Sequence, residues 1–520
     1  MVTDHKTYDA IIIGSGFGGA MMAKKLVDAG WHVAMVERGQ KVIRGRHNWD
    51  RKSSLDLTRQ YDFSQPYTID KGGNKANMGT YEALGGPSIF YGGVSFRFRE
   101  NDFHPPSDIT ADTGAKWPVD YNDLMVYYDE AESILQISGD DGPDPTAPPR
   151  FRTYPQGVSP IAKVSDRIHS AAMHLGLNPF RMPLAINYED DTRNTCVRCT
   201  TCDTFACAIG AKNDLETMVF SQLSQNQNFE VYQNTIVAFL EFKNGRIDSI
   251  HCYDKPSSKK FTLQSKWIIL SAGALGSPHL ILSSGLDSIN PAGKYIGRFL
   301  MRHVNAIIFG IYPTPPDKEK IFHKELAIMD YYFGHESIPY PLNKIGSLQQ
   351  IATPPSGLVE NEAPFLLGKI AASSVRLLTG LLAIAEDQPQ FKNRIYINEK
   401  IKSIYGMPSP HIYSEYSDRD IAALHALSQK AKMILKKTGA WTQYTHHIKT
   451  FSHSVGTVRM GDNLNNAPLD RFCQFRGLKN MFVVDGSFMP TSAAVNPSLT
   501  ISANALRVAD YLIQNVNCLQ

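Results

Sequence analysis

The stretch that decides the fold is residues 8–37, "YDAIIIGSGFGGAMMAKKLVDAGWHVAMVE". An apolar run ends at Gly14, a glycine-rich turn opens a segment with helical spacing, and a second apolar run ends at Glu37. Short apolar runs on both sides of a helical segment predict a β-α-β unit. The N-terminal part therefore belongs to the α/β class.

The turn in this unit has the spacing of a dinucleotide-binding loop, because Gly14, Gly16 and Gly19 satisfy G-x-G-x-x-G. The first glycine permits the tight turn, the second lets the backbone approach a pyrophosphate, and the third allows close packing of helix on strand. The helix N-terminus then offers free N–H groups to the phosphates. Glu37, 23 residues after Gly14, stands where an acid binds a ribose. This motif alone does not separate NAD from FAD.

The composition excludes one class of partner. The chain has 520 residues, of which 42% are hydrophobic and 20% charged, and its formal net charge is +3. That charge creates no strong field for polyanions, and no run of Lys and Arg forms a basic stripe. We expect no nucleic-acid partner.

The N-terminus, "MVTDHKTYDAIIIG", lacks the basic start and small-residue cleavage site of a signal peptide, so we expect a cytoplasmic protein with reduced thiols. The most apolar window, residues 365–386, is interrupted by Lys369 and Arg376 and falls short of the ~20 residues of a membrane helix. We predict a buried amphipathic helix there and no transmembrane segment. A greasy surface beside a membrane or a lipophilic substrate is the alternative.

Other segments continue the pattern. Residues 267–285 read as strand, turn and helix, residues 480–490 as a strand entering a turn, and residues 496–513 as a helix with a defined start. The Pro-rich stretch 139–160 is predicted to be a surface excursion. Residues from about 300 to 440 are richer in Tyr, Pro and long loops and predict a separate unit.

Several motifs, in order over nearly the whole chain, resemble the glucose–methanol–choline (GMC) flavin oxidoreductases. Beyond the N-terminal unit they are "LGGPSIFYGGVSFRFRENDF" (84–103), "WPVDYNDLMVYYDEAE" (117–132), "AEDQPQFKNRIYI" (385–397) and "HSVGTVRMG" (453–461). The resemblance implies FAD rather than NAD. It also implies a Rossmann-like FAD-binding domain of discontinuous segments, 1–300 and 441–520, and an α+β substrate-binding domain with a mainly antiparallel sheet, 301–440.

The resemblance further implies a catalytic pair beside the flavin, His453 and Asn496. Imidazole, with a reference pKa of ~6.5, suits the removal of an alcohol proton near neutral pH. The amide of Asn496 can donate a hydrogen bond to the developing alkoxide, and the flavin accepts the hydride, so the chemical step needs no metal.

The FAD-binding residues that the motif and the resemblance together imply are Gly14, Gly16, Gly19, Glu37, Gly86, Ser88, Gly92, Val237, Asp485, Gly486 and Pro497. Some members of the family attach FAD covalently through a histidine of the flavin loop. Here Phe90 stands at that position and the loop contains no histidine. We therefore expect FAD to be bound non-covalently.

Four cysteines, Cys196, Cys199, Cys202 and Cys207, follow C-x2-C-x2-C-x4-C. Bacterial ferredoxins use three residues before the fourth cysteine and a proline after it, and zinc sites usually need two separated pairs. The segment resembles "CxRCxTCDGFPCxxxAKxDAE" of a bacterial branch of the family. Structural thiols or a local disulfide are favoured, an iron–sulfur cluster is the main alternative, and another metal or redox role is the third.

We expect an enzyme that oxidises an alcohol on a sugar, a sterol or another ring, with oxygen, a quinone or a redox protein as electron acceptor. Two alternatives belong to other classes. One is the flavin subunit of an electron-transfer dehydrogenase complex with an iron–sulfur cluster, and the other is a lyase of the same family that keeps its FAD.

Overall fold

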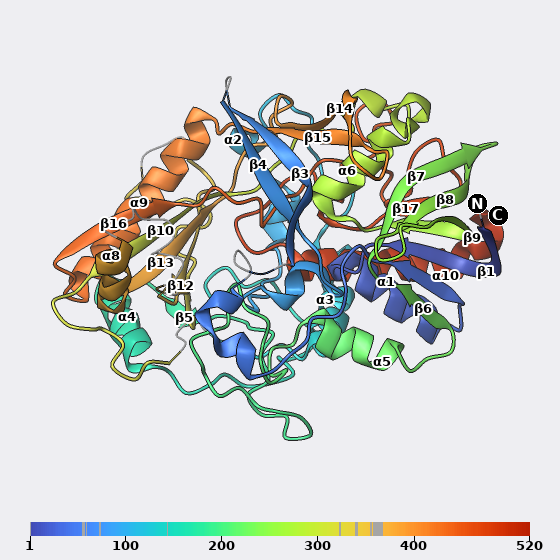
Figure 1. The fold of residues 1–520 in the computed structure, drawn as a ribbon. Coiled ribbons are helices and arrows are strands. Elements are labelled where there is room, and N and C mark those ends of the chain that lie inside the picture. The colour runs from blue at the N-terminus through green and yellow to red at the C-terminus, as the bar shows by residue number, and fades with distance from the viewer. Residues whose placement is uncertain are drawn as a thin grey trace.

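A computed structural model describes residues 2–54, 58, 60–71, 74–142, 144–321, 324–338, 342–353, 356 and 368–519. Figure 1 shows two main sheets, one on the right beside both chain termini and one on the left under helix α9, with the crossing strands β3, β4, β14 and β15 above and between them. The described part of the chain is thus mixed α/β, with parallel and antiparallel sheets in separate places.

The first sheet has seven strands in the order β6-β2-β1-β9-β8-β7, with β17 paired to β9. Strands β6, β2, β1, β9 and β17 run parallel, and β8 and β7 are added antiparallel. Their bounds are β1 Val2–Ile13, β2 Val33–Val36, β6 Phe229–Tyr232, β7 Thr235–Lys243, β8 Arg246–Asp254, β9 Lys260–Leu270 and β17 Met481–Val483. The strands come from distant parts of the sequence, so this half is discontinuous.

Helices complete this half: α1 (Phe17–Asp28), α3 (Tyr121–Leu135), α5 (Ser221–Leu223), α6 (Gly273–Ser283) and α10 (Ser498–Leu519). The predicted strand-turn-helix at 267–285 and the predicted C-terminal helix are confirmed by β9–α6 and by α10. Helix α10 packs against α1 and α3.

The second sheet is antiparallel throughout, in the order β16-β10-β13-β12-β11-β5. Its strands are β5 Pro179–Arg181, β10 Val304–Ile311, β11 Leu326–Ile328, β12 Gly346–Ile351, β13 Leu378–Ala385 and β16 Thr442–His447. Helices α4 (Lys163–Met173) and α9 (Asp418–Lys437) share its core. The edge strands β5 and β16 lie outside 301–440, so this sheet draws on more of the sequence than the predicted range.

A third sheet has the order β14-β15-β3-β4 and joins distant segments, because β15 (Pro408–Tyr413) pairs in parallel with β3 (Tyr61–Lys71). Strands β4 (Asn74–Tyr81) and β14 (Arg394–Lys402) flank them, and two short helices, α2 (Ser107–Thr110) and α8 (Gly368–Ser374), lie elsewhere in the chain. The third sheet therefore links the first half of the sequence to the middle region.

The predicted helix at 365–386 is wrong for most of its described part. Helix α8 ends at Ser374, and residues 378–385 form β13, the strand between β10 and β12. Residues 365–367 lie outside the described residues. An apolar run of this length fits a strand covered on both faces as well as a buried helix, and here α9 covers one face.

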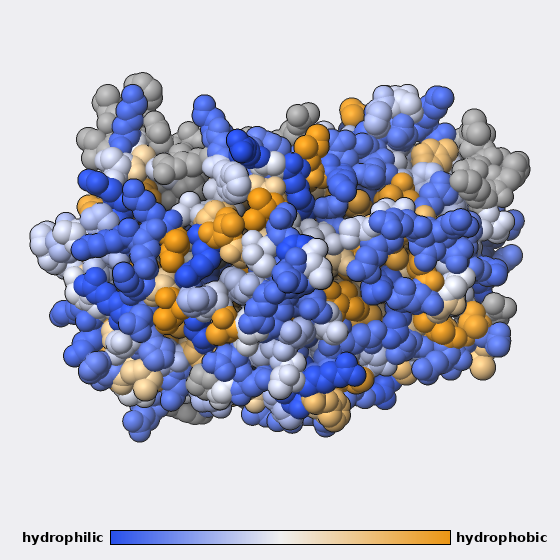
Figure 2. Space-filling model, turned by 90° about the horizontal axis from the view of Figure 1, so that it is seen from below, coloured by the Kyte–Doolittle hydropathy of each residue, from blue (hydrophilic) through white to orange (hydrophobic). Residues whose placement is uncertain are grey.

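No helix of the described residues is long and apolar enough to cross a membrane. On the face seen in Figure 2, hydrophobic side chains lie in several separate groups among hydrophilic ones.

Candidate active site

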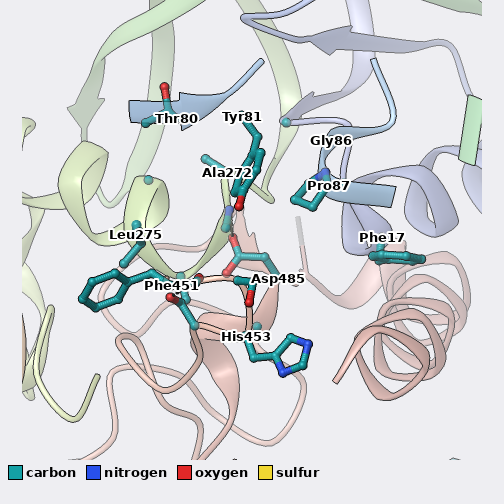
Figure 3. A pocket seen from close by; sticks show the side chains of 18 of the residues that line it. Phe17, Thr80, Tyr81, Gly86, Pro87, Ala272, Leu275, Phe451, His453 and Asp485 are labelled. Carbon is teal, nitrogen blue, oxygen red and sulfur yellow. Dashed lines mark hydrogen bonds between the residues drawn. The ribbon is translucent and has the colours of Figure 1, made fainter. Parts of the chain in front are cut away.

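A cavity of ≈ 540 Å³ lies where the carboxyl ends of the parallel strands meet the third sheet and one end of the antiparallel sheet. In α/β folds this edge of the sheet is where ligands bind. Figure 3 shows that its walls come from distant segments, with Phe17, Gly86, Ala272, His453 and Asp485 among them.

The glycine turn lines the cavity, and its backbone is most open at Gly16. A Cβ on Gly14 would lie 2.3 Å from the carbonyl oxygen of Ser271, and a Cβ on Gly19 would lie 2.1 Å from that of Gly14. A Cβ on Gly16 would meet nothing within 4 Å, although Gly16 lines the cavity. Helix α1 starts there without a side-chain cap and without an acid in its first turn. Its first N–H groups therefore suit a pyrophosphate.

Two buried carboxylates frame this turn. Glu37 accepts hydrogen bonds from the N–H and hydroxyl of Ser15, at 3.0 and 2.6 Å, and from the N–H of Gly39 at 2.8 Å. Asp485 accepts from the N–H of Gly273 at 3.0 Å and from that of Ser487 at 2.9 Å. Both residues line the cavity, and these bonds hold the loops around it in place.

Of the predicted site residues, eleven line this one cavity: Gly14, Gly16, Glu37, Gly86, Gly92, Val237, His453, Asp485, Gly486, Asn496 and Pro497. Gly19 supports it from behind, as its packing role requires. Ser88 does not line the cavity. Its hydroxyl donates to the carbonyl of Gly85 at 2.7 Å and accepts from the N–H of Leu215 at 3.1 Å, so it fixes the loop instead.

His453 lies beside a second histidine that the sequence did not indicate. Met301 and Val455 form an antiparallel bridge, which brings His303, next to β10, against His453. Their Nδ1 atoms are 3.1 Å apart, and their rings meet edge to face with centroids 5.1 Å apart. The partnership exists only in the folded chain, because 150 residues separate the two.

The hydrogen-bond chain fixes the tautomer of His453. The carbonyl oxygen of Ser492, 3.1 Å from His303 Nε2, can only accept, so Nε2 of His303 carries its proton. Burial lowers the pKa of His303, so the ring is neutral and its Nδ1 is an acceptor. His453 Nδ1 must therefore donate to it, which leaves the lone pair of His453 on Nε2.

Asn496 completes this chain. Its Nδ2 lies 3.3 Å from His453 Nε2 and donates to it, while its Oδ1 accepts from Gln349 Nε2 at 3.0 Å. Gln349, on β12, thereby holds the amide with its NH₂ group toward His453. A basic nitrogen and an amide donor thus stand together on the cavity wall.

Electrostatics keep this nitrogen unprotonated. The pKa of His453 lies well below its ordinary value, first because burial disfavours the imidazolium, then because His303 and Lys324 are close. The backbone at His303 and the Ser492 side chain are held too, since Asp387 accepts from the N–H of His303 at 3.1 Å and from the hydroxyl of Ser492 at 2.9 Å.

The cysteine-rich segment forms part of the same wall. All four of its cysteines are free thiols, and no group of three or more His, Cys, Asp or Glu side chains among the described residues is arranged to hold a metal. Lys212 fixes the segment by donating to the carbonyls of Tyr91, Cys202 and Phe205, at 2.9, 3.2 and 2.7 Å. The four thiols, as they lie here, do not fit a cluster.

Comparison with known proteins agrees with this geometry. The family description "GMC oxidoreductase" matches residues 8–305 and again residues 389–505. The chain therefore belongs to the GMC oxidoreductase family. It is a flavoprotein with an FAD-binding Rossmann-type fold, and it acts on CH–OH donors.

Individual relatives are distant. The chain is similar to the 6'''-hydroxyparomomycin C oxidase of Streptomyces lividus, with 27% identity over 98% of this chain and 91% of the relative. It is also similar to the fructose dehydrogenase large subunit of Gluconobacter japonicus, with 25% identity over 98% of each chain. The solved structure of pyridoxine 4-oxidase from Mesorbium loti shares the fold, with a TM-score of 0.66, 19% identity, and 97% and 99% of the two chains covered.

Proposed function

We propose that this protein binds FAD non-covalently in the cavity and oxidises an alcohol, with His453 as the base. The observation that carries the proposal is the chain from the Ser492 carbonyl through His303 to His453, which leaves the Nε2 lone pair beside the Asn496 amide. The cofactor residues Gly14, Gly16, Glu37, Gly86, Gly92, Val237, Asp485, Gly486 and Pro497 are proposed to hold the FAD that this fold binds. FAD, when bound, supplies a two-electron acceptor for the hydride of the alcohol carbon.

Side chains of the protein can accept the proton of the alcohol hydroxyl and stabilise the alkoxide that remains. An alcohol hydroxyl that displaces Asn496 from His453 Nε2 can give its proton to that nitrogen. The NH₂ group of Asn496, held by Gln349, then donates to the alkoxide oxygen and stabilises its charge. His453 becomes an imidazolium that donates through Nδ1 to His303, so the developing positive charge has a hydrogen-bonded partner.

Non-covalent attachment is supported by Phe90, which lines the cavity where a covalently linked member has histidine. We also propose a cytoplasmic location. For the electron acceptor we propose oxygen, a quinone or a redox protein. The alternative of a flavin subunit in an electron-transfer complex is supported by the relative named as a large subunit, and the arrangement of the thiols opposes an iron–sulfur cluster.

The proposal is tested by anaerobic reduction of the bound flavin with a panel of alcohols, comparing the wild type with His453→Gln. The variant should retain FAD while its reduction slows by ~100-fold or more, which is the usual loss on removing a general base. His411→Gln is the matched control, because His411 is also buried but lies on β15 outside the cavity lining. Reduction of His453→Gln at the wild-type rate would remove His453 from the mechanism, and a wild type that no alcohol reduces would favour the lyase alternative.

A further inference from the structure

One ion pair on the cavity wall has no role in the proposed base or in the proposed FAD contacts. Lys324 Nζ lies 3.0 Å from Asp203 Oδ1 and 3.2 Å from Oδ2, and both residues line the cavity with His453 and Asn496. The Lys324 side chain is 8% exposed and that of Asp203 is 26% exposed. The pair is therefore enclosed by protein on most sides, while the carboxylate keeps an accessible part.

The pair lies directly on the predicted flavin loop. A Cβ on Gly92 would be 1.9 Å from Asp203 Oδ1 and 2.6 Å from Lys324 Nζ. Only glycine at this position lets the charged groups come so close to the loop. The backbone of Gly92 does not require glycine, because its φ is not among the positive values.

The cysteine-rich segment brings Asp203 to this place and holds it there. Thr204 donates its N–H to the carbonyl of Phe90 at 2.8 Å, and Lys212 ties the carbonyls of Cys202 and Phe205 to that of Tyr91. Asp203 stands between these anchors. These hydrogen bonds fix the position of the Asp203 carboxylate in the cavity wall. The cysteine-rich segment therefore has a structural role that needs no metal.

A third polar group comes from the antiparallel sheet. Asn305, on β10, is 8% exposed and lines the cavity, and its Oδ1 has no hydrogen-bond partner among the described residues. The register pairs Asn305 and Ser347 with the same residue of β13, Ile384, so they share one face. Gln349 lies two residues further along that face and holds Asn496. Asn305 therefore presents an unsatisfied acceptor on the same wall as the base.

We propose that Asp203, Lys324 and Asn305 form a subsite for further hydroxyl groups of the substrate, so that the substrate is a neutral polyol rather than a monohydroxy or sterol-like alcohol. This inference rests on the proposed alcohol oxidation. A hydroxyl group both donates and accepts, and the subsite offers acceptors on Asp203 and Asn305 and a donor on Lys324. The charges of Asp203 and Lys324 balance, so a neutral partner matches them.

An apolar alcohol would be selected against. It would cover the ion pair without hydrogen-bonding to it and would leave the Asn305 oxygen without a partner, and sites built to bind a hydroxyl reject analogues that lack it for this reason. Asp203, Lys324 and Asn305 line the same cavity as His453 and Asn496, so the subsite and the base face a common space.

The test uses the FAD-loaded enzyme and two alcohol panels under anaerobic conditions. One panel contains pentoses, hexoses and cyclitols, and the other contains cyclohexanol, cyclohexylmethanol, benzyl alcohol and a sterol. We expect the second-order rate constant of flavin reduction to be at least ~10-fold higher for the best polyol than for any monohydroxy alcohol. In Asn305→Leu and in the double variant Asp203→Asn/Lys324→Met, this ratio should fall at least ~10-fold while FAD remains bound. The double variant avoids leaving one buried charge alone.

The outcomes separate the two proposals. If monohydroxy alcohols reduce the flavin as fast as polyols, or if both variants keep the wild-type ratio, the subsite is refuted and alcohol oxidation stands. If neither panel reduces the wild type, the proposed function itself fails. A second readout guards against variants that fold poorly: the best polyol should raise the Tm of the oxidised wild type more than that of Asn305→Ser, and an equal rise in both would also refute the subsite.

Discussion

Replacement of His303 tests the hydrogen-bond chain more sharply than replacement of the base. His303→Leu removes the acceptor of the His453 Nδ1 proton, so the proton is no longer held on that nitrogen. His303→Asn keeps an oxygen near the position of the lost Nδ1. The two variants therefore differ chiefly in whether an acceptor faces His453.

The size of the effect follows from the 3.1 Å contact. A hydrogen bond contributes roughly 0.5–1.5 kcal/mol, and a buried donor left without a partner costs about 1–3 kcal/mol. Since each 1.4 kcal/mol corresponds to about tenfold in an equilibrium constant, the ratio of the tautomer with a free Nε2 to the other tautomer should fall by ~10-fold in His303→Leu. Flavin reduction should slow by up to the same factor, and His303→Asn should stay within about threefold of wild type.

The assay is stopped-flow reduction of the bound flavin at saturating alcohol without oxygen, with His411→Leu as the control for the loss of a buried histidine. FAD content and Tm are measured in parallel. A His303→Leu enzyme that reduces its flavin at the wild-type rate would refute the tautomer assignment. Equal slowing of the Leu and Asn variants would show that His303 acts through packing rather than as an acceptor.

Four further predictions concern the base, the turn and the thiols. The pKa of His453 lies well below 6.5, so the base is already neutral near pH 6.5. The rate of flavin reduction should therefore stay flat between about pH 8 and 6. A step in this rate at the ordinary histidine pKa would contradict the prediction. The same depressed pKa contributes stability that is lost as pH falls below 6.5, because the unfolded histidine binds the proton that the folded one excludes. Gly14→Ala places a Cβ 2.3 Å from a carbonyl oxygen at φ +97°, so it should lower the free energy of unfolding by at least ~1–2 kcal/mol and yield protein with little FAD, measured by denaturation and absorbance. Cys199→Ser/Cys207→Ser should keep both FAD and the reduction rate; iron present at several atoms per FAD in the wild type and lost in this variant would overturn the structural role of the thiols.

The sequence predicts those parts of the site that can be recognised from a local pattern of residues or from a motif. Residues 8–37 form the predicted β1-α1-β2 unit, and the cavity joins the glycine turn to His453 and Asn496 from the far end of the chain. The contact between His303 and His453 cannot be predicted from the local sequence pattern. That contact depends on the bridge between Met301 and Val455, which joins segments far apart in the sequence.

The helix predicted at 365–386 is wrong, and the role predicted for Ser88 stays a prediction, for related reasons. Residues 378–385 are apolar throughout, and such a run does not reveal whether neighbouring strands or helices cover it, so β13 was predicted as helix. Ser88 lies in a loop that borders the cavity, but the direction of a side chain in a loop depends on backbone angles that the sequence pattern does not specify. Asp203 could have been noticed as the one acid within the cysteine-rich segment. Its proposed role, however, depends on its ion pair with Lys324, which the sequence does not show.

The bridge between Met301 and Val455 has a consequence for the biogenesis of the enzyme. The glycine turn is encoded in the first twenty residues, whereas the bridge beside His453 and His303 needs residue 455 to have been synthesised. The cavity residues Asp485, Gly486 and Pro497 come later still, so the cofactor cavity and the base are both completed by the last segments of the fold. A newly made molecule therefore stays inert until its last hundred residues are in place.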